Sequence, residues 1–176
     1  MHFAIERATA DNARELAAVH IAAWQSAYRG IIPDDFLDSM PQQIEQRAEK
    51  FRQAIEEQQG FYYVPVVFSR NRKQNGKIIG KLVLWKSRDD DKPAAGEVGG
   101  IYLLEEFWDR GYGRAMMDFS IKILTDMGHT EILLWVLEDN TRARQFYEKC
   151  GFAFDGTKKE IVIGKPLVEI RYVLNM

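Results

Sequence analysis

Apolar residues in the N-terminal third of the chain recur mainly with the spacing of amphipathic helices. Residues 3–8 predict a short strand, and the hydroxyl of Thr9 can accept from an unpaired amide of the helix that follows. Gly30 is expected to end this helix and Pro33 to begin a short second one. The buried face of the first helix would carry Leu16, Val19, Ala23, Trp24, Ala27 and Tyr28.

A third helix is predicted before the chain changes to strand-like patterns. It would end near Gly60, and its apolar stripe is Ile44, Ala48, Phe51 and Ile55. Residues 61–69 and 77–85 are rich in aromatic and β-branched residues, which favour strands. The charged residues 70–76 between these two runs fit a hairpin turn. Residues 88–95 form a polar loop.

The remaining pattern alternates strands and helices. A strand over 97–103 precedes an amphipathic helix over 113–127, and a strand over 131–136 precedes a helix over 141–150. The predicted apolar side of the first of these helices is Met116, Phe119, Ile123 and Met127. Two further strands are predicted over 152–159 and 167–174. Because no repeat or low-complexity linker interrupts the chain, we expect one mixed α/β domain over residues 1–176.

Composition narrows the class of protein. The chain has 176 residues, within the roughly 100–200 residues of a single core. A net charge of -2 provides no overall positive field for nucleic acid or an acidic membrane. The single cysteine, Cys150, excludes an internal disulfide and a multi-cysteine metal site. The amino terminus predicts a strand rather than a signal peptide, and no run reaches the roughly 20 apolar residues of a membrane span. We expect a cytoplasmic enzyme or binding domain.

The most informative segment is a glycine turn between the strand at 97–103 and the helix at 113–127. Gly111 and Gly113 lack a Cβ atom, so the backbone there can approach a ligand closely and adopt positive φ. Free amides at a helix start favour an anion such as a pyrophosphate, and Arg110 and Arg114 add positive charge at the rim. On these glycines alone, a tight structural turn explains the pattern equally well.

Two other phosphate-binding folds fit this turn less well. A Walker loop requires Lys followed by Ser or Thr after its glycines, whereas this chain has Arg114 and Ala115. A dinucleotide fingerprint requires a small residue three positions after the second glycine, where Met116 stands.

A second segment begins about thirty residues later. Asn140 is a good helix N-cap and Gly151 a good C-terminal stop. One face of the helix between them would carry Ala143, Phe146, Tyr147 and Cys150. On this pattern alone, Tyr147 is a packed core aromatic.

Together, the two segments resemble the GNAT superfamily of acetyl-CoA-dependent N-acetyltransferases. The family's helix motif, Asn-x-x-Ala-x-x-Phe-Tyr-x-x-x-Gly-Phe, is met in full from Asn140 to Phe152. Its loop motif, Gln/Arg-x-x-Gly-x-Gly/Ala, is met from Trp108 to Gly113, except that Trp108 replaces Gln or Arg. Aligned from Arg110 instead, residues 110–115 match the loop motif better. We prefer the first, because it turns Met116 and Met117 towards the core.

The resemblance implies the GNAT fold, with a mixed, mostly antiparallel sheet of about seven strands that is splayed at the acetyl-CoA site. Gly99 and Gly100 would form the bulge that opens the sheet. The family's pantetheine arm lies along the preceding strand, with a backbone amide near Ile101 stabilising the oxyanion. The cofactor-binding residues that this implies are Ile101, Tyr102, Leu103, Asp109, Arg110, Gly111, Tyr112, Gly113, Arg114, Asn140, Ala143 and Tyr147.

The resemblance also implies catalytic roles for direct transfer in a ternary complex without a metal. Tyr147 matches the family's general acid, which protonates the departing thiolate. Glu97 falls where several relatives carry a base glutamate that acts through water; the alternative is a surface charge at a strand end. Cys150 is expected to be a small helix residue, and His20 and His129 to be structural.

The acceptor is expected to be a primary amine of a small molecule or peptide. Its pocket would draw on Trp24, Tyr28, Glu97 and the segment 31–36, although Trp24 is better explained as a core residue. The alternative function is a catalytically silent CoA-binding sensor or partner domain. An O-acyltransferase or a user of longer acyl-CoA also remains open, as does a homodimer.

Overall fold

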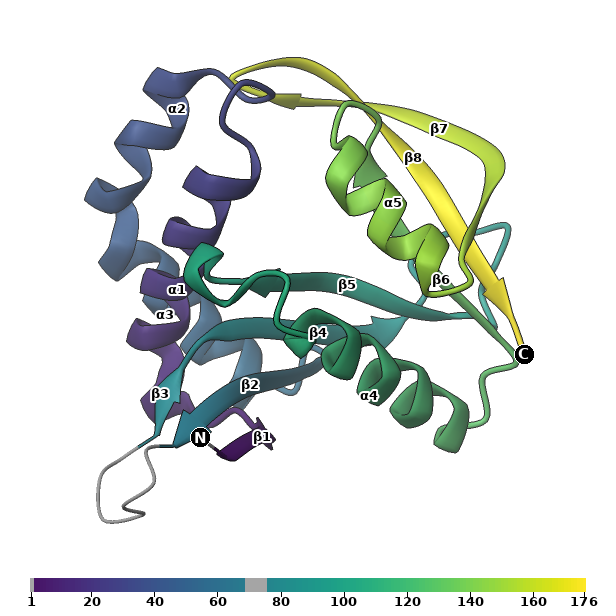
Figure 1. Ribbon diagram of the computed structural model, residues 1–176, viewed down its shortest axis with the longest axis horizontal. Coiled ribbons are helices and arrows are strands. Elements are labelled where there is room, and N and C mark those ends of the chain that lie inside the picture. The colour runs from purple at the N-terminus through teal and green to yellow at the C-terminus, as the bar shows by residue number, and fades with distance from the viewer. Residues whose placement is uncertain (1, 69–75) are drawn as a thin grey trace.

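The computed structural model describes residues 2–68 and 76–176, and these form an open sheet with helices on both faces (Figure 1). The sheet has eight strands in the order β1-β2-β4-β5-β6-β8-β7, with the short β3 paired to β2. All neighbouring strands are antiparallel except β5 and β6. The strands are β1 (His2–Arg7), β2 (Phe61–Phe68), β3 (Lys77–Ile78), β4 (Gly80–Lys86), β5 (Gly96–Leu103), β6 (Glu131–Leu137), β7 (Ala153–Ile163) and β8 (Lys165–Asn175).

The helices follow the sequence prediction closely. They are α1 (Ala13–Ala27), α2 (Asp34–Ser39), α3 (Ile44–Glu56), α4 (Tyr112–Asp126) and α5 (Thr141–Lys149), with 3-10 turns at Ala10–Asn12, Met40–Gln43 and Glu105–Phe107. Gly30, with φ of 80°, lies beyond the end of α1, and Pro33 precedes α2, as expected. The predicted turn at residues 70–76 lies outside the described residues except for Gly76.

Two hydrophobic clusters place the helices on opposite faces of the sheet. Val83 and Tyr62 pack with Leu16 and Val19 of α1 on one face. On the other face, Leu82, Leu84 and Val98 pack with residues of α4 and α5, including Met116, Met117 and Tyr147. In Figure 1, α1 and α3 accordingly lie on the left of the view, and α4 and α5 lie towards the right.

The predicted buried face of α4 is partly wrong. Met116 is fully buried, but Met127 is 42% exposed. The buried residues of α4 are Met116, Met117, Ser120 and Leu124. Ser120 can be buried because its hydroxyl donates to the carbonyl of Met116 at 2.7 Å, so no polar atom is left without a partner. Burial of Met116 and Met117 agrees with the preferred register of the glycine loop.

A bulge in β5 separates β5 from β6. Val83 pairs with Gly100 and Leu84 with Val98, which leaves Gly99 as the extra residue. A Cβ atom on Gly99 would lie 1.4 Å from Nε1 of Trp85, so only glycine fits there. Parallel pairing of β5 with β6 is confined to Gly96 and Glu97, and beyond them the two strands diverge. The splayed sheet expected from the sequence is therefore present.

Candidate active site

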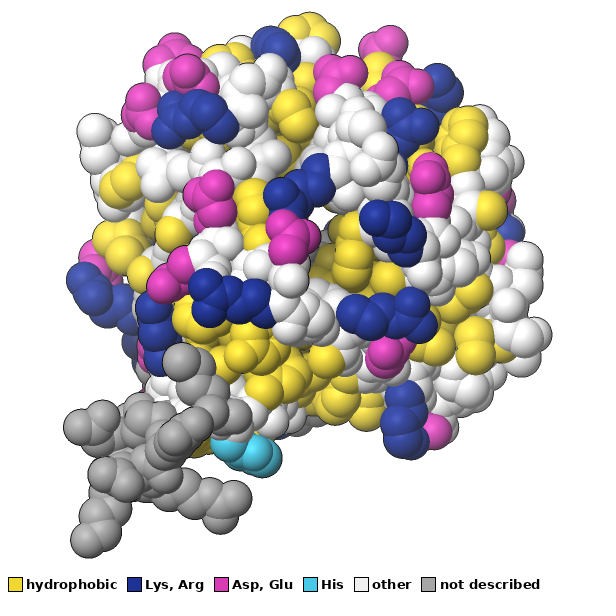
Figure 2. All heavy atoms as spheres, viewed as in Figure 1, with side chains coloured by type: hydrophobic (Ala, Val, Ile, Leu, Met, Phe, Trp, Pro, Cys, Tyr) yellow, Lys and Arg dark blue, Asp and Glu magenta, His cyan; other side chains and the backbone are white. Residues whose placement is uncertain are grey.

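A cavity of about 750 Å³ lies where β5 and β6 diverge. It is continuous from the start of α4 and the inner side of α5 to the C-terminal end of α1 and the strands β6 to β8. Figure 2 shows this face hollowed near its centre, with basic and acidic side chains around the opening. One end of the cavity therefore meets the glycine turn, and the other is lined by aromatic and charged side chains. We call these the turn end and the far end.

At the turn end, the backbone has the conformation that the sequence predicts for an anion-binding loop. Gly111 is the N-cap of α4 with φ of 83°, and Asp109 also has positive φ, at 57°. No atom lies within 4 Å of a Cβ built on Gly111, and one on Gly113 would meet only Phe146, at 3.5 Å. The first amides of α4 have no partner within the helix, so they and the helix dipole favour an anion.

Trp108 has a structural role that the loop motif did not predict. Its indole Nε1 donates to the carbonyl of Leu103 at 2.8 Å, which ties the loop to the end of β5. The guanidinium of Arg142, in the first turn of α5, stacks on the Trp108 ring at 4.1 Å and pairs with Asp109 at 2.9 Å. Trp108 thus connects β5, the glycine loop and α5, the three elements that form this end of the cavity.

The predicted cofactor-binding residues line the cavity with two exceptions. The walls include Ile101, Tyr102, Leu103, Asp109, Gly111, Gly113, Arg114, Asn140, Ala143 and Tyr147. Arg110 and Tyr112 are not among the lining residues. Tyr112 packs on Phe3 with ring centroids 4.9 Å apart, and Arg110 lies over Phe107.

Helix α5 places Tyr147 at the middle of the cavity. Asn140 caps the helix by accepting from the amide of Ala143 at 3.1 Å, as predicted. Tyr147 is 9% exposed and lines the cavity. Burial, with a smaller effect from Tyr102, raises the pKa of Tyr147 well above its usual value. Its phenol therefore stays protonated at neutral pH and is available as a proton donor.

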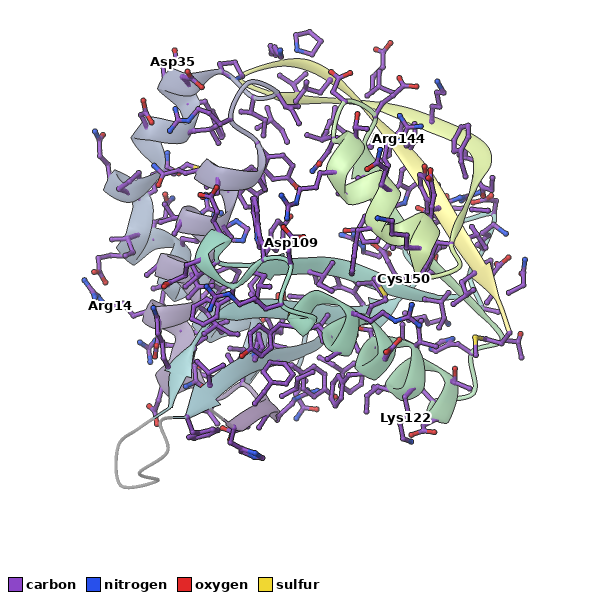
Figure 3. All side chains as sticks on the ribbon, viewed as in Figure 1. Arg14, Asp35, Asp109, Lys122, Arg144 and Cys150 are labelled. Carbon is purple, nitrogen blue, oxygen red and sulfur yellow. The ribbon has the colours of Figure 1, made fainter. Side chains whose placement is uncertain are left out.

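Cys150 lies at the C-terminal end of α5, facing α4 (Figure 3). It is absent from the residues that line the cavity. Burial is the main cause that raises the pKa of its thiol, so the thiolate is scarce at neutral pH. These properties fit a small packed residue, as expected.

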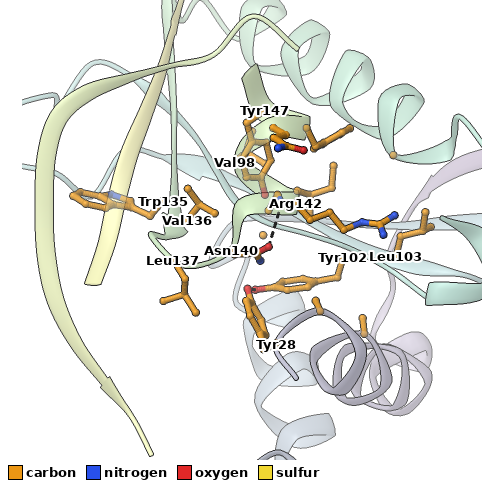
Figure 4. A pocket seen from close by; sticks show the side chains of 18 of the residues that line it. Tyr28, Val98, Tyr102, Leu103, Trp135, Val136, Leu137, Asn140, Arg142 and Tyr147 are labelled. Carbon is orange, nitrogen blue, oxygen red and sulfur yellow. Dashed lines mark hydrogen bonds between the residues drawn. The ribbon is translucent and has the colours of Figure 1, made fainter. Parts of the chain in front are cut away.

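The far end holds two tyrosines and the predicted base. The hydroxyls of Tyr28 and Tyr102 are 3.5 Å apart (Figure 4). Glu97 is only 2% exposed and accepts from the Arg88 guanidinium at 2.6 Å and 3.3 Å, and from the Arg88 amide at 3.3 Å. Glu97 is thus a buried carboxylate with a charged partner, not a strand-end surface charge. Trp24 does not line the cavity but packs on His20 and Tyr28, as a core residue.

Four residues that line the far end are not predicted as site residues from the sequence. Arg88, Trp135, Lys159 and Glu169 all line it. The ammonium of Lys159 lies 3.7 Å from the centre of the Trp135 ring and 3.3 Å from the Glu169 carboxylate. Nothing in the spacing of these residues marks them, because they come from a loop and three different strands. Only the pairing of Lys159 with Glu169 across β7 and β8 could have been anticipated, and that required the strand register.

Arg171 holds the loop that carries Arg88. It is 3% exposed and binds Asp89, Asp91 and Asp155 at 2.6 to 3.0 Å. Hydrogen bonds to these carboxylates, first to Asp91, raise its pKa. The loop between β4 and β5 is thereby fixed to β7 and β8 beside the cavity.

Within residues 2–68 and 76–176, no group of three or more His, Cys, Asp or Glu residues is arranged to hold a metal ion. In the same part of the chain, none of the helices combines the length and the apolar character needed to cross a membrane.

Known proteins resemble this chain in sequence and fold. A family model described as "Acetyltransferase (GNAT) family" matches residues 19–152. "Uncharacterized N-acetyltransferase YuaI" of Bacillus subtilis is 26% identical over 136 residues, which cover 77% of this chain and 72% of that protein. "Uncharacterized N-acetyltransferase Rv2669" of Mycobacterium tuberculosis is 31% identical over 86 residues, 49% of this chain and about half, 53%, of that protein. The solved PaiA N-acetyltransferase of Thermoplasma acidophilum, in complex with coenzyme A, aligns over 100% of both chains with 19% identity and a TM-score of 0.75.

Proposed function

The chain belongs to the GNAT acetyltransferase family and is an N-acetyltransferase, and we propose that it moves the acetyl group of acetyl-CoA to a primary amine bound at the far end of the cavity. The observation that carries this proposal is the continuous cavity, which runs from the glycine turn past Tyr147 to Glu97 and Glu169. A thioester donor and an amine acceptor can therefore meet beside a proton donor. Direct transfer between them requires no enzyme-bound acyl intermediate.

The turn end fits a coenzyme A pyrophosphate. The open space over Gly111 and the unpaired amides at the start of α4 suit a bulky anion. Arg114 and Arg142 line the same end and supply positive charge. We assign the pantetheine arm to the diverging edge of β5, at Ile101 and Leu103, where the sheet leaves backbone groups without a neighbouring strand. An amide there would also stabilise the oxyanion of the attacked thioester.

Two proton transfers complete the proposed reaction. An amine that enters as an ammonium must lose a proton before it attacks, and the thiolate that leaves must gain one. Tyr147 is assigned the second transfer, because its phenol is protonated and lies in the middle of the cavity. Glu97 is assigned the first, through water, because it lies at the far end on β5.

Glu169 is a second candidate for the base. Glu97 already accepts three hydrogen bonds from Arg88, which occupy both of its oxygens and leave less room for a bridging water or an amine. Glu169 has a single contact, 3.3 Å, to Lys159. Glu169 lines the same cavity, and its charge raises the pKa of Tyr28, although burial, Tyr102 and Tyr147 contribute more.

The function is tested by measuring free CoA released from acetyl-CoA when amines are added. Amine-dependent release is expected for at least one class of small amine or peptide. Binding of CoA without release for any amine would support a silent sensor domain instead. Longer acyl-CoA thioesters are then added to the acetyl-CoA reaction to identify the acyl donor. Because they would share the CoA site, they should act either as competitive inhibitors or as substrates.

The two carboxylates are separated by a pH series of Glu97→Gln and Glu169→Gln. Loss of the base should lower kcat most at low pH, where most of the amine is protonated, by about 10- to 100-fold. Raising the pH should partly restore the rate, because the free amine needs less help. A carboxylate that only attracts a cationic amine should instead raise KM with kcat near normal. If neither variant changes either constant, both assignments are wrong.

A further inference from the structure

Two basic side chains, His20 and Lys81, lie against the rings of Tyr102 and Phe51, and the charge of a third, Arg47, lowers the pKa of both; none of the three lines the cavity. His20 comes from α1, Arg47 from α3 and Lys81 from β4. The His20 ring lies 5.2 Å from the Tyr102 ring and 5.7 Å from the Phe51 ring. The ammonium of Lys81 lies 4.5 Å from the centre of Phe51 and 5.3 Å from that of Tyr102. We call His20, Arg47 and Lys81 the basic cluster.

His20 and Lys81 are buried and Arg47 is half-buried, and buried polar atoms without partners gather among them. His20 and Lys81 are each 5% exposed. Among the described residues, neither ring nitrogen of His20 nor Nε of Arg47 has a hydrogen-bond partner. Buried polar groups without partners are rare in native proteins, and each requires an explanation such as an ion or ordered water. Here three such atoms occur together, the two ring nitrogens of His20 and Nε of Arg47. One nitrogen of a neutral imidazole is an acceptor, and the other two atoms are donors.

The charges of the basic cluster are also unbalanced. Burial, and then the positive charge of Arg47, lower the pKa of Lys81 to about 7. Burial followed by Lys81 and Arg47 lower the pKa of His20 well below its usual value. The titratable groups coupled to Lys81 or in contact with it are His20, Arg47 and Tyr102, and among the described residues no carboxylate is a cause of its lowered pKa. An anion would supply both the missing charge and the missing acceptors.

We propose that His20, Arg47 and Lys81 form a binding site for an anionic oxygen group the size of a carboxylate. Tyr102 connects this site to the reaction, because its ring covers the basic cluster while its edge lines the far end and its hydroxyl meets Tyr28. None of the three residues lines the cavity, so the Tyr102 ring separates the basic cluster from the far end. The anion is therefore a separate small anion, or the acidic group of an acceptor amine that displaces the Tyr102 ring.

Sodium acetate is a suitable probe for this site. At pH 6, acetate should raise the melting temperature of the wild-type protein by about 2–4 °C over sodium chloride of equal ionic strength. The affinity should fall roughly tenfold between pH 6 and pH 8, because the charged fraction of Lys81 falls by that factor around its pKa of about 7. The imidazole resonances of His20 should shift saturably with acetate in the same range. The chain has only 3 histidines, so His20→Gln suffices to assign them.

Lys81→Met is the variant that tests the charge, and Lys86→Met is its control on the exposed end of the same strand. Lys81→Met should abolish the acetate effect, whereas Lys86→Met should keep it. Without acetate, Lys81→Met should melt no lower than the wild type, because its apolar side chain removes a buried base. This gain in stability of Lys81→Met over the wild type should grow as the pH falls from about 10 towards 7. In that range Lys81 takes up a proton in the unfolded wild type but not in the folded wild type, so the wild type loses stability.

The source of the anion is found with matched acceptors, an amino acid and the amine left when its carboxyl group is removed. This arm rests on the proposed acetyl transfer, whereas melting and resonance shifts do not. The preference of the wild type for the acid-bearing amine is measured as its kcat/KM relative to that of the matched amine. If Lys81→Met lowers this preference by 10-fold or more, the anion in the site is the acceptor's own acidic group. If the preference is the same in Lys81→Met as in the wild type, and acetate still stabilises the wild type, the anion in the site is a separate small anion. If acetate changes neither the melting temperature nor the His20 resonances of the wild type, the basic cluster holds water only and the proposal is wrong.

Discussion

Replacing Tyr147 with Phe is expected to lower kcat by about 10- to 1,000-fold, the usual contribution of a general acid. The ring packs against Phe146 and Phe152, and Phe keeps those contacts. No hydrogen bond of the Tyr147 hydroxyl to a described residue would be lost, so the melting temperature and the affinity for CoA should change little. The rate of CoA release at saturating acetyl-CoA and amine measures the effect, provided that chemistry limits turnover.

Tyr172→Phe is the matched control for Tyr147→Phe. Tyr172 is 1% exposed, its hydroxyl donates to Glu148 at 2.6 Å, and it lies outside the cavity. Removing this hydroxyl should lower stability by about 1 kcal/mol but leave kcat near normal. The two variants therefore separate proton donation from a general effect of losing a buried hydroxyl. A Tyr147→Phe enzyme with wild-type kcat would make Tyr147 a packing residue.

The elements that form the turn end were predictable because their signals are local. The Asn140 cap and the positive φ of Gly111 depend on residues within a few positions of each other. Such features follow from the backbone preferences of single residues, so the residue types predict them directly. The order and separation of the two motifs then identified the family.

The far end could not be predicted in the same way. Glu97 was found because it lies on the strand before the glycine loop, but its partner Arg88 belongs to a polar loop without a motif. Lys159 and Glu169 resemble ordinary surface charges until β7 and β8 are brought beside β6. The basic cluster was missed for the same reason, since its members come from three elements and are adjacent only in the fold.

The face of α4 was misjudged for a different reason. An apolar stripe at helical spacing assigns Met127 to the core and leaves Ser120 outside it. The structure reverses both, because the Ser120 hydroxyl is satisfied within the helix and Met127 is the C-cap, after the last helical residue. Hydrophobicity alone cannot show this, since it ignores hydrogen bonds that a small polar residue makes to its own helix.

Gly111→Val is expected to abolish the stabilisation by CoA. The substitution adds a branched side chain at φ of 83° that would project into the open space at the start of α4. It should therefore cost the fold about 1–2 kcal/mol in backbone strain and also exclude the pyrophosphate from the amides. In the wild type, CoA at 100 times its Kd should add about 2.7 kcal/mol of stability, and this increment should vanish in the variant.

Gly128→Val separates strain from ligand exclusion. Gly128 has φ of 92° and also has no atom within 4 Å of a Cβ, but it follows the other end of α4 and does not line the cavity. Both variants should therefore lose similar stability without CoA, and only Gly111→Val should lose the rise in melting temperature with CoA. Calorimetric titration of CoA into each folded variant gives the same comparison without heating. Equal CoA affinity in Gly111→Val and Gly128→Val would mean that the glycine turn does not hold the pyrophosphate, and the cofactor would have to be sought at another part of the cavity.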